Sequence, residues 1–432
     1  MGWPTGASVT GMTRSPTERS YAEKLDADDD LAAFVGRFVI DDPDLIYLDG
    51  NSLGRLPRTT PERLARAVDE EWGRDLIRSW DHWIDLPTRV GDLIADTLVG
   101  ADSGEVTVSD STTVNLYKLA AAALDARPGR HVIITDDDNF PTDRYVIEGL
   151  AAARGSTVRM IGSDPVHGPA FDALAAAIDE DTALVTLSHV AYRSGALADM
   201  AQITRLTHER GALVLWDLCH SVGSVPVELS AAGADLAVGC TYKYVNGGPG
   251  SPAFLYVRRE LQEELRQPIW GWFGQRDMFA MGPAYDPEPD VRRFMAGTPP
   301  ILGVYAVEEG ARLLAEAGMD RVRAKGTALT SYLIDLADAW LTPLGFSVAT
   351  PRDPARRGAH VSLQHEQAWP ICQAYIDRSR VIPDFRSPDR LRLGPAPLTT
   401  RFVDVWEGLL RLRTLVENGE YESYATVHSR VT

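Results

Sequence analysis

The most informative stretch of this chain is Thr241-Tyr242-Lys243-Tyr244-Val245-Asn246-Gly247-Gly248-Pro249-Gly250. It follows an apolar run at 235–240, and its glycines indicate a loop that leaves a strand. Lys243 is one of only four lysines among 43 basic residues, so arginine supplies almost every plain positive charge. A shielded primary amine can lose its proton and condense with an aldehyde, which a guanidinium cannot do. We interpret Lys243 as a reactive amine; the alternative is a surface lysine in a turn.

An acidic residue closes another apolar run upstream of this loop. The run 212–216 is continuous and apolar, which indicates a buried strand, and Asp217 stands at its end. A strand-end carboxylate followed by a loop lysine is what pyridoxal phosphate (PLP) requires, namely an acid for the ring nitrogen and an amine for the aldehyde. The alternative for Asp217 is to cap a helix after the strand.

Strand-like and helix-like segments alternate on both sides of this pair, from about residue 105 to 257. Continuous apolar strands separated by helices predict an α/β fold with a mostly parallel sheet covered on both faces. The expected strands are 131–135, 156–161, 183–188, 212–216, 235–240 and 253–257, and the expected helices include 112–126, 143–154 and 199–210.

The two ends of the chain have a different pattern. A helix is expected from Thr60, and its apolar stripe of Leu64, Val68, Trp72, Leu76 and Trp80 predicts one buried face. Helices at 301–317 and 320–341, followed by short strands near 346–349, 360–364 and 390–393, predict a smaller α+β domain. We therefore expect a flexible tail at 1–20, a large domain at 21–305 and a small domain at 306–432.

Composition excludes several classes of function. A net charge of −18 argues against nucleic acid or an anionic membrane as the main partner. No apolar stretch reaches membrane-spanning length. The three cysteines, Cys219, Cys240 and Cys372, fit no zinc motif, so no metal is expected, and their odd number favours a reducing compartment such as the cytoplasm.

Further candidate ligand residues follow neighbouring strands, whose carboxyl ends share one edge of a parallel sheet. Thr112 and Thr113 open an apolar helix, where hydroxyls and free amides bind phosphate or simply cap the helix. Phe140 is suited either to stacking on a flat ring or to core packing. Asp143 either orients a neighbour or caps a helix, and His220 either contacts the cofactor or is a satisfied histidine near a helix start.

Arg392 lies between apolar residues on a short expected strand. A guanidinium in that setting suits a bidentate clamp for the carboxylate of an amino acid. The alternative is an outward-facing arginine on an alternating strand.

With these residues in place, the chain resembles the kynureninases, PLP enzymes of fold type I. The most specific stretch is 216–254, with Asp217-Leu218-Cys219-His220 and the Lys243 loop. The resemblance covers about 30 to 425 and also rests on 47–54, 110–116, 140–143, 271–274, 297–300, 384–389 and 391–395.

The resemblance implies hydrolysis of L-kynurenine to anthranilate and L-alanine, in tryptophan catabolism, NAD biosynthesis or a specialised pathway. It implies a sheet of the seven-stranded type and catalytic roles for Lys243, Asp217 and Tyr242. It places Arg392 on the substrate carboxylate and Ser52 and Trp80 in the aryl pocket. The implied cofactor contacts are Thr112, Thr113, Phe140, Thr142, Asp143, Ser188, Asp217, His220, Tyr242, Lys243, Trp272 and Thr298.

The resemblance also implies a homodimer in which Trp272 and Thr298 reach the phosphate of the neighbouring subunit. Three positions depart from the family pattern. Cys219 stands where alanine is usual, and Gln275 stands where histidine is frequent. Thr298 stands where animal enzymes, which favour 3-hydroxykynurenine, have asparagine; threonine is more like the bacterial enzymes that act on kynurenine itself. A modified kynurenine remains an alternative substrate.

Two other functions are compatible with the pattern. A cysteine desulfurase of the same class would need a cysteine on a mobile loop, whereas Cys372 falls in a helix-like stretch at 368–376. A non-catalytic protein with this fold would be expected to have lost Lys243, which is present.

Overall fold

The computed structural model describes residues 15–424. Residues 1–14 of the expected flexible tail lie outside this range. The described part of that tail contacts the C-terminal part of the chain, since Tyr332 and Trp406 donate hydrogen bonds to the carbonyl oxygens of Pro16 and Thr17. The first helix, α1 (Arg19–Ala27), follows directly.

The larger part of the fold is a seven-stranded sheet in the order β2-β10-β9-β8-β7-β3-β4. Strands β9, β8, β7, β3 and β4 are parallel, and β10 is antiparallel to both of its neighbours. The predicted α/β fold with a mostly parallel sheet is therefore confirmed. The strands are β2 (Val106–Val108), β3 (Val132–Asp136), β4 (Thr157–Ile161), β7 (Thr182–Ser188), β8 (Leu213–Asp217), β9 (Leu236–Gly239) and β10 (Phe254–Val257).

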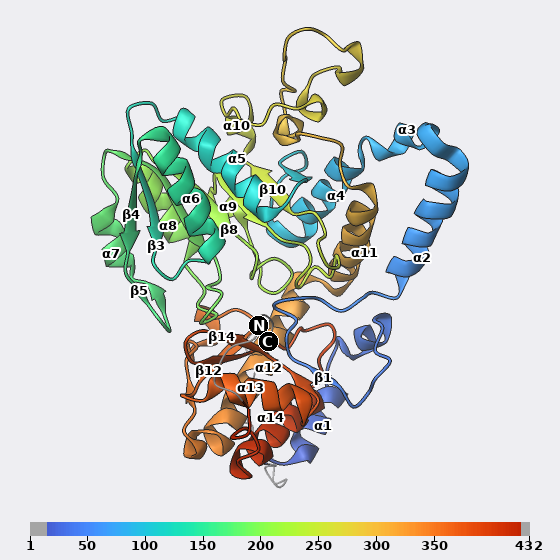
Figure 1. Cartoon of the computed structure of the whole chain (residues 1–432), viewed down its shortest axis with the longest axis vertical. Helices are drawn as coiled ribbons and strands as arrows, with labels where there is room; N and C mark the ends of the chain where they lie inside the picture. The colour runs from blue at the N-terminus through green and yellow to red at the C-terminus, as the bar shows by residue number, and fades with distance from the viewer. Residues whose placement is uncertain (1–14, 425–432) are drawn as a thin grey trace.

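Helices cover both faces of this sheet (Figure 1), because its strands are apolar on both sides. In β8, Leu213 and Leu215 join a core that includes α5 and α6, whereas Val214 and Trp216 join a core that includes α4, α8 and α11. The helices are α4 (Leu86–Ile94), α5 (Thr112–Asp125), α6 (Pro141–Arg154), α7 (Phe171–Ala177), α8 (Met200–Glu209), α9 (Leu229–Ala232), α10 (Arg259–Gln262) and α11 (Ile301–Ala317).

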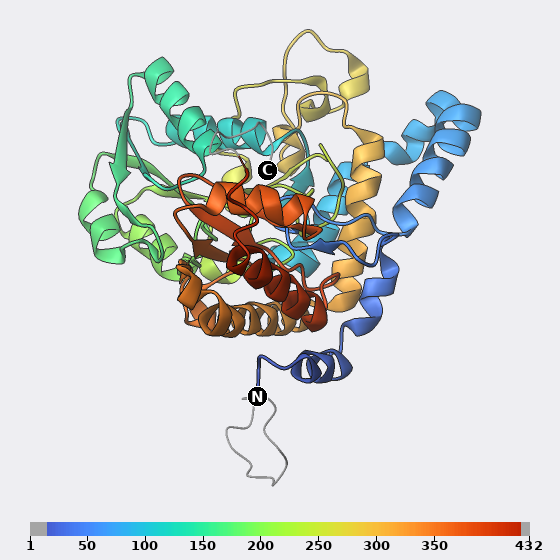
Figure 2. The same cartoon turned by 60° about the horizontal axis from the view of Figure 1, so that its bottom comes forward.

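A four-stranded antiparallel sheet, β11-β12-β15-β14, carries a separate core. Figure 2 brings this side forward and shows its helices gathered around the sheet. The elements are α12 (Met319–Trp340), β11 (Ser347–Val348), β12 (Val361–Gln364), α13 (Ala368–Asp377), β14 (Asp384–Arg386), β15 (Arg390–Leu393) and α14 (Phe402–Glu417). Two further pairs are β1 (Ile46–Tyr47) with β13 (Val381–Ile382), and β5 (Ser163–Asp164) with β6 (Gly168–Pro169).

The N-terminal segment packs with this second core rather than with the large sheet. Ala22, Ile46 and Leu48 are all buried there. Helix α12 follows α11 directly at Gly318, so the two helices join the cores. The expected division between residues 305 and 306 stays a prediction.

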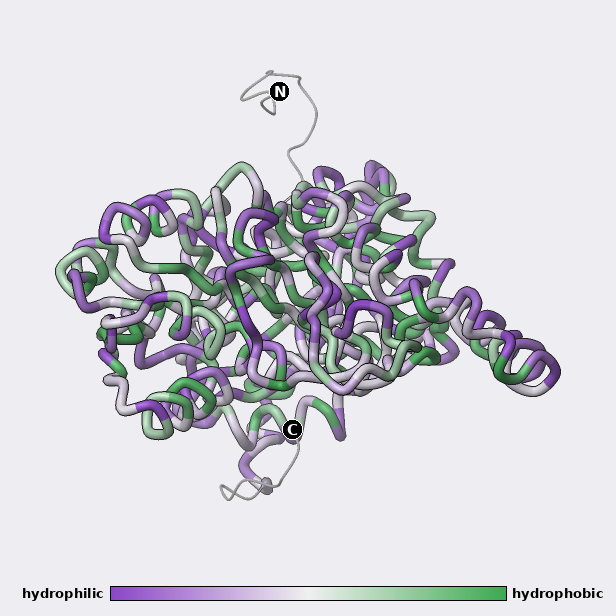
Figure 3. The backbone as a smooth tube through the Cα atoms, turned by 90° about the horizontal axis from the view of Figure 1, so that it is seen from above, coloured by the Kyte–Doolittle hydropathy of each residue, from purple (hydrophilic) through white to green (hydrophobic). Residues whose placement is uncertain are grey.

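The helix expected from Thr60 differs from the prediction. Helix α2 (Thr59–Arg66) continues as π-helical turns at Ala67–Asp75 and ends in the short α3 (Trp80–Trp83). Only Leu64 packs against the core, whereas Val68, Trp72 and Leu76 are 39%, 60% and 59% exposed. The chain therefore does not bury this face by itself, and the prediction of one continuous buried face is wrong for the single chain. The segment projects from the body as an arm, seen at the right of Figures 1 and 3.

The loop that carries Lys243 lies between two glycines. Helix α11 approaches it at Gly310, where an added Cβ would overlap the carbonyl oxygen of Val245. On the other side, Gly54 donates its N–H to the carbonyl oxygen of Tyr242 at 2.8 Å, and a Cβ there would overlap the carbonyl oxygen of Lys243. No side chain fits at either position, so both glycines determine where the loop lies.

Gly310→Ala is expected to lower the free energy of unfolding by about 1–3 kcal/mol, the usual cost of overpacking. Urea unfolding followed by tryptophan fluorescence measures the change. Gly149→Ala is the matched control, because nothing lies within 4 Å of a Cβ at that position in α6. Alanine there should raise stability by up to about 1 kcal/mol. An equal effect of both substitutions would contradict the close approach at Gly310.

Candidate functional site

The carboxyl ends of the central strands gather polar side chains at one edge of the large sheet. Ser188 ends β7 and lies opposite Asp217, which ends β8. The Ser188 hydroxyl donates to Asn139 Oδ1 at 2.8 Å and lies 3.4 Å from Asp217 Oδ2, while Asp217 Oδ1 accepts from the Cys219 amide at 2.8 Å. Asp217 thus points into the site with a fixed orientation. The turn that follows is not a regular helix, so helix capping is excluded as its role.

The Lys243 side chain is only 8% exposed, which excludes a surface lysine. Its Nζ lies 3.0 Å from His220 Nε2 and about 6 Å from the ring centres of Phe140 and Tyr242. Burial, followed by the charge of Lys243, lowers the pKa of His220 well below its ordinary value. The imidazole therefore stays neutral and its Nε2 can accept a hydrogen bond from the amine.

Asp143 lies beside Asp217 as a second buried carboxyl group. Burial raises its pKa well above the ordinary value, and the neighbouring charge of Asp217 raises it further. Two carboxyl groups this close are not both ionised at neutral pH, and the proton lies on Asp143. Asp143 is in the first turn of α6 but does not cap it, because Phe140 is the residue at the helix start.

The start of α5 forms the side of the site suited to an anion. Ser111 caps the helix, Thr112 is half-buried with its hydroxyl 3.8 Å from Cys219 Sγ, and Thr113 is exposed. A cavity of about 340 Å³ opens here between the helix start and the Lys243 loop. Free amides and hydroxyls at a helix N-terminus bind phosphate. The cavity is lined by Asp110, Ser111, Thr112, Cys240, Tyr242, Gly250, Ser251, Pro252, Ala253 and Pro300.

Phe140 and Thr142 occupy the start of α6 on the opposite side. Phe140 is 37% exposed, which excludes core packing, and its ring meets the edge of Tyr192 at 5.3 Å. Thr142 is half-buried in the first helical turn. Asn139, which no motif singled out, orders this segment by bonding Ser188, Thr135 and the Phe140 amide. The only sequence signal for Asn139 is its position shortly after the expected strand 131–135.

Two free, buried cysteines, Cys219 and Cys240, are neighbours of Tyr242. Cys219 Sγ accepts a hydrogen bond from the Cys240 amide at 3.2 Å, and the Cys240 thiol lies 3.7 Å from the Cys219 carbonyl oxygen. Burial, with the neighbouring thiols, raises the pKa of Tyr242, so its phenol keeps its proton at neutral pH. The departure from alanine at 219 thus places sulfur against Cys240 and Thr112.

Arg392 and Ser52 meet in a polar cluster at the edge of the small sheet. Arg392 is 1% exposed, which excludes an outward-facing arginine. Its Nε donates to Asp384 Oδ1 at 2.9 Å, and its Nη2 donates to Asp384 Oδ2 and to the Ser52 hydroxyl. Asp384 was missed by the sequence analysis. Only the pairing of β14 with β15 places it opposite Arg392, and no spacing rule reveals that pairing.

Within one chain, Trp80, Trp272 and Thr298 lie outside the group of residues that surrounds Lys243. The rings of Trp80 and Trp272 both meet Phe273, at 5.9 and 4.8 Å, and Thr298 is exposed. No hydrogen bond, ion pair or ring contact within residues 15–424 joins them to Lys243. The Gln275 amide is occupied within its own loop, by the Asp286 N–H and the Arg276 carbonyl oxygen.

Rarity alone did not identify the reactive lysine. Lys118 and Lys325 are also buried, in ion pairs with Asp110 and Asp29 at 2.7 Å each. Lys24 is exposed. What separates Lys243 from the two buried lysines is its partner, a neutral imidazole rather than a carboxylate.

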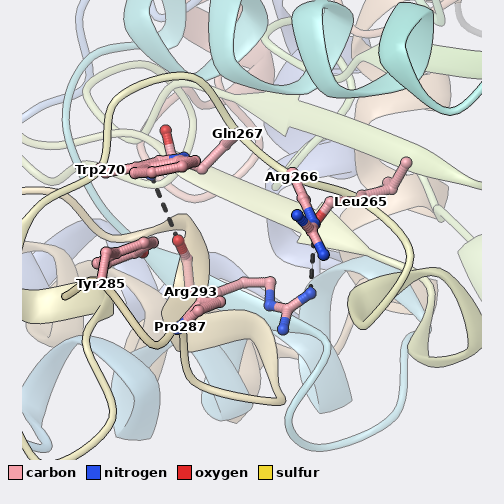
Figure 4. A pocket seen from close by; sticks show the side chains of 7 residues that line it. All are labelled: Leu265, Arg266, Gln267, Trp270, Tyr285, Pro287 and Arg293. Carbon is pink, nitrogen blue, oxygen red and sulfur yellow. Dashed lines mark hydrogen bonds between the residues drawn. The ribbon is translucent and has the colours of Figure 1, made fainter.

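A second cavity, of about 170 Å³, contains none of the predicted site residues. Trp270 stacks on Tyr285 with ring centres 5.0 Å apart, and Gln267 donates to the Arg293 carbonyl oxygen (Figure 4). Within residues 15–424 no cluster of His, Cys, Asp or Glu is arranged to hold a metal ion. The part of the chain that the structure describes also contains no helix long and apolar enough to cross a membrane.

The residues around Lys243 fit an aldehyde-bearing pyridine phosphate. A buried amine, a strand-end carboxylate, a partly exposed aromatic face and a helix start surround one space. Asp143 Oδ2 and His220 Nδ1 are buried there without a hydrogen-bond partner among residues 15–424, as expected where a polar ligand belongs.

Comparisons with known proteins agree with this geometry. The family model for class-V aminotransferases matches residues 88–368. The chain is 44% identical over 409 residues to the kynureninase of Pseudomonas fluorescens, covering 93% of this chain and 96% of that one. It is equally identical over 407 residues to the kynureninase of Burkholderia pseudomallei, covering 92% and 95%.

Solved structures with this fold include cysteine desulfurases. That of Thermococcus onnurineus has a TM-score of 0.74 at 19% identity, covering 92% of this chain and 98% of the other. One from Escherichia coli has a TM-score of 0.76 at 17% identity, covering 90% and 99%. Identities this low show the fold alone, whereas 44% identity across nearly the whole chain shows the family. The chain belongs to the kynureninase family, within the class-V aminotransferases.

Proposed function

We propose that the protein is a PLP-dependent hydrolase that cleaves the Cβ–Cγ bond of L-kynurenine to give anthranilate and L-alanine. The 44% identity to curated kynureninases over 93% of the chain carries the proposal. The buried amine of Lys243 near the fixed carboxylate of Asp217 supports it. In the balanced reaction, the hydroxyl of water goes to Cγ and a proton goes to Cβ.

Bound PLP supplies an aldehyde that condenses with amines and a ring that accepts an electron pair. Lys243 is the amine that holds the aldehyde, because it is the only buried lysine of residues 15–424 without a carboxylate partner. Asp217 holds the ring nitrogen, and Ser188 and the Cys219 amide orient it. Phe140, which is partly exposed beside Lys243, would stack on the ring, and Thr142, Asp143 and His220 would complete its surroundings.

The start of α5 would hold the phosphate. Thr112 and Thr113 offer hydroxyls and amides there, and Tyr242 offers a phenol that keeps its proton. The same cavity borders Pro300, next to Thr298 and Pro299 in the chain. Trp272 and Thr298 complete this site from a second subunit.

Proton transfers are assigned to two side chains. Lys243 takes the proton from the substrate Cα, because its amine is shielded and its neighbour His220 is a neutral acceptor. Tyr242, whose phenol stays protonated, is the donor placed to return a proton to Cβ. Arg392 binds the α-carboxylate, with Ser52 beside it. Within one chain Trp80 contacts Phe273 rather than this site, so its place at the aryl group rests on the family resemblance alone.

The alternative of a cysteine desulfurase is disfavoured by the position of the thiols. Cys372 is fully buried within α13, and burial raises its pKa. Cys219 and Cys240 are buried as well. None of the three lies on an exposed loop. Free, buried thiols also support a reducing compartment such as the cytoplasm.

A homodimer is supported by two exposed apolar surfaces. The arm presents Val68, Trp72, Leu76 and Ile77, and the loop between α10 and α11 presents Trp270, Trp272, Phe279 and Met281. Side chains this large are exposed together where another chain covers them.

The function is tested by anthranilate fluorescence on adding kynurenine, with 3-hydroxykynurenine compared side by side; we expect kynurenine to be turned over faster. Lys243→Arg should lower turnover by about 10²–10⁴-fold or more, because the charge is kept but the base is lost. Lys24→Arg, on an exposed helix, is the matched control and should retain full activity. Borohydride reduction and mass spectrometry should locate the PLP adduct on Lys243; an adduct elsewhere, or sulfide release from cysteine without anthranilate, would contradict the proposal.

Substrate affinity is expected to fall as pH rises through about 7. Burial, and then the neighbouring Asp384, raise the pKa of Asp49 to about 7. Below that pH Asp49 is neutral, so Arg386, Arg392 and Asp384 leave one net positive charge; above it the cluster is neutral. Burial raises the pKa of Tyr47, Tyr244 and Cys372, which also face Asp49, so these groups stay protonated throughout.

The KM for kynurenine should therefore rise several-fold between about pH 6 and 8, and by at most about ten-fold per pH unit. Asp49→Asn should flatten that profile while leaving the pH dependence of kcat unchanged. A variant whose KM still follows the wild-type profile would rule out Asp49 as its origin.

The oligomeric state is measured by analytical ultracentrifugation. We expect twice the chain mass of 47.3 kDa. Trp72→Arg should weaken the dimer, because a charge would be placed in the covered arm. Tyr145→Arg, at an equally exposed aromatic on α6, is the control and should leave the mass unchanged. A monomeric wild type would refute the shared site.

A further inference from the structure

Asp384 holds one edge of the Arg392 guanidinium. The two residues lie directly opposite each other on β14 and β15, and their side chains are 2% and 1% exposed. Asp384 Oδ1 accepts from Nε at 2.9 Å and Oδ2 accepts from Nη2. This bidentate contact occupies the edge of the guanidinium between Nε and Nη2.

The terminal edge, between Nη1 and Nη2, has only neutral partners. Nη1 donates to the Tyr192 carbonyl oxygen, and Nη2 donates to the Ser52 hydroxyl at 3.1 Å. Ser52 in turn donates to Asp384 Oδ2 at 2.8 Å. With its amide oxygen toward the guanidinium, Asn51 accepts from Nε and Nη2 at 2.7 and 2.9 Å, so it shares the Nε–Nη2 edge with Asp384 and does not contact Nη1. No carboxylate of residues 15–424 bonds to Nη1.

A count of the donors shows what remains for a ligand. A guanidinium has five N–H groups. Asp384 takes two, Tyr192 one and Ser52 one, which leaves one N–H of Nη1 without a partner among residues 15–424. A carboxylate that takes this N–H, and the Nη2 N–H now bonded to Ser52, makes a bidentate contact on the terminal edge.

We propose that Asp384 is a positioning residue that fixes Arg392 so that its terminal edge receives the α-carboxylate of an amino-acid ligand, with Ser52 giving up its hydrogen bond from Nη2. The inference rests on the proposed function in taking Arg392 as the carboxylate-binding residue. It adds the edge that is used and the residue that fixes it.

Two effects of Asp384 on a bound carboxylate have opposite signs. Its negative charge weakens the attraction between Arg392 and an anion, whereas its bidentate contact removes the rotational freedom of the guanidinium before the ligand arrives. Replacing Asp384 by asparagine removes the charge but turns an amide N–H₂ toward Nη2, so the fork loses its orientation. If orientation is the larger effect, removal of the charge weakens binding, the reverse of what simple electrostatics predicts.

The test is Asp384→Asn in the holoenzyme, with L-alanine and L-alaninamide binding measured by isothermal titration calorimetry. The Kd of L-alanine should rise about ten-fold or more, as for loss of one charge-assisted hydrogen bond. The Kd of L-alaninamide, which lacks the carboxylate, should stay within about two-fold, because it does not use the fork. With kynurenine, KM should rise by the same factor as the alanine Kd while kcat changes little.

Asp389→Asn is the matched control, since Asp389 pairs with Arg390 beside the same strand but at the rim, and it should change neither Kd. Asp384→Glu keeps the charge and should restore part of the affinity; it also preserves the test if the Asp384→Asn substitution disturbs folding. Tighter or unchanged alanine binding in Asp384→Asn, or an equal loss for both ligands, would overturn the inference. If Asp384→Asn weakens the binding of L-alanine but not of L-alaninamide, and the wild-type protein does not cleave kynurenine, the inference stands and the proposed function is refuted.

Discussion

The backbone contact between the Lys243 loop and its two glycines is the constraint on which the rest of the site depends. Gly310 lets α11 touch the loop at Val245, and Gly54 binds the Tyr242 carbonyl oxygen from the N-terminal segment. Three parts of the chain, far apart in sequence, meet within one turn of backbone. Because the close approach leaves no room for a Cβ, the amine has one place to lie, beside His220 and opposite the strand end that carries Asp217.

Around that amine the protein keeps ionised groups few. Burial leaves His220 neutral and Asp143 protonated. Burial also raises the pKa of the Tyr242 phenol, and the hydrogen bond with Cys240, followed by burial, raises the pKa of the Cys219 thiol, so both groups keep their protons. In a low-dielectric site an unpaired charge is costly, so neutral donors and acceptors dominate and a charged ligand meets a small number of specific partners. The guanidinium of Arg392, by contrast, forms a buried ion pair with Asp384.

The sequence predicted the large sheet almost strand by strand, because apolar runs such as 212–216 must be buried on both faces. It also predicted that Asp217, His220, Lys243 and Phe140 lie close together, since each follows a strand and strand ends share an edge, and the structure brings these four residues together. It missed Asp384, Asn51 and Asn139, whose roles come from pairing between distant segments rather than from local pattern. It misread the arm after Thr60, because a helical apolar stripe shows that a surface is covered but not which chain covers it. The scarcity of lysine pointed to Lys243, but it did not distinguish Lys243 from Lys118 and Lys325, which form buried ion pairs with carboxylates.

The corner between α11 and α12 has a mechanical consequence. The chain changes direction there at Gly318, whose φ of 78° disfavours other residues, and α12 continues from it into the second core. Lys243 follows β9 of the large sheet, and Arg392, the proposed carboxylate-binding residue, lies on β15 of the small sheet. An amino acid bound to both residues would link the two cores non-covalently. Only ligands whose length matches the distance between the two residues could form this link. A ligand that binds only when the two cores are docked would therefore stabilise their docking, and any change that loosens the docking would weaken ligand binding.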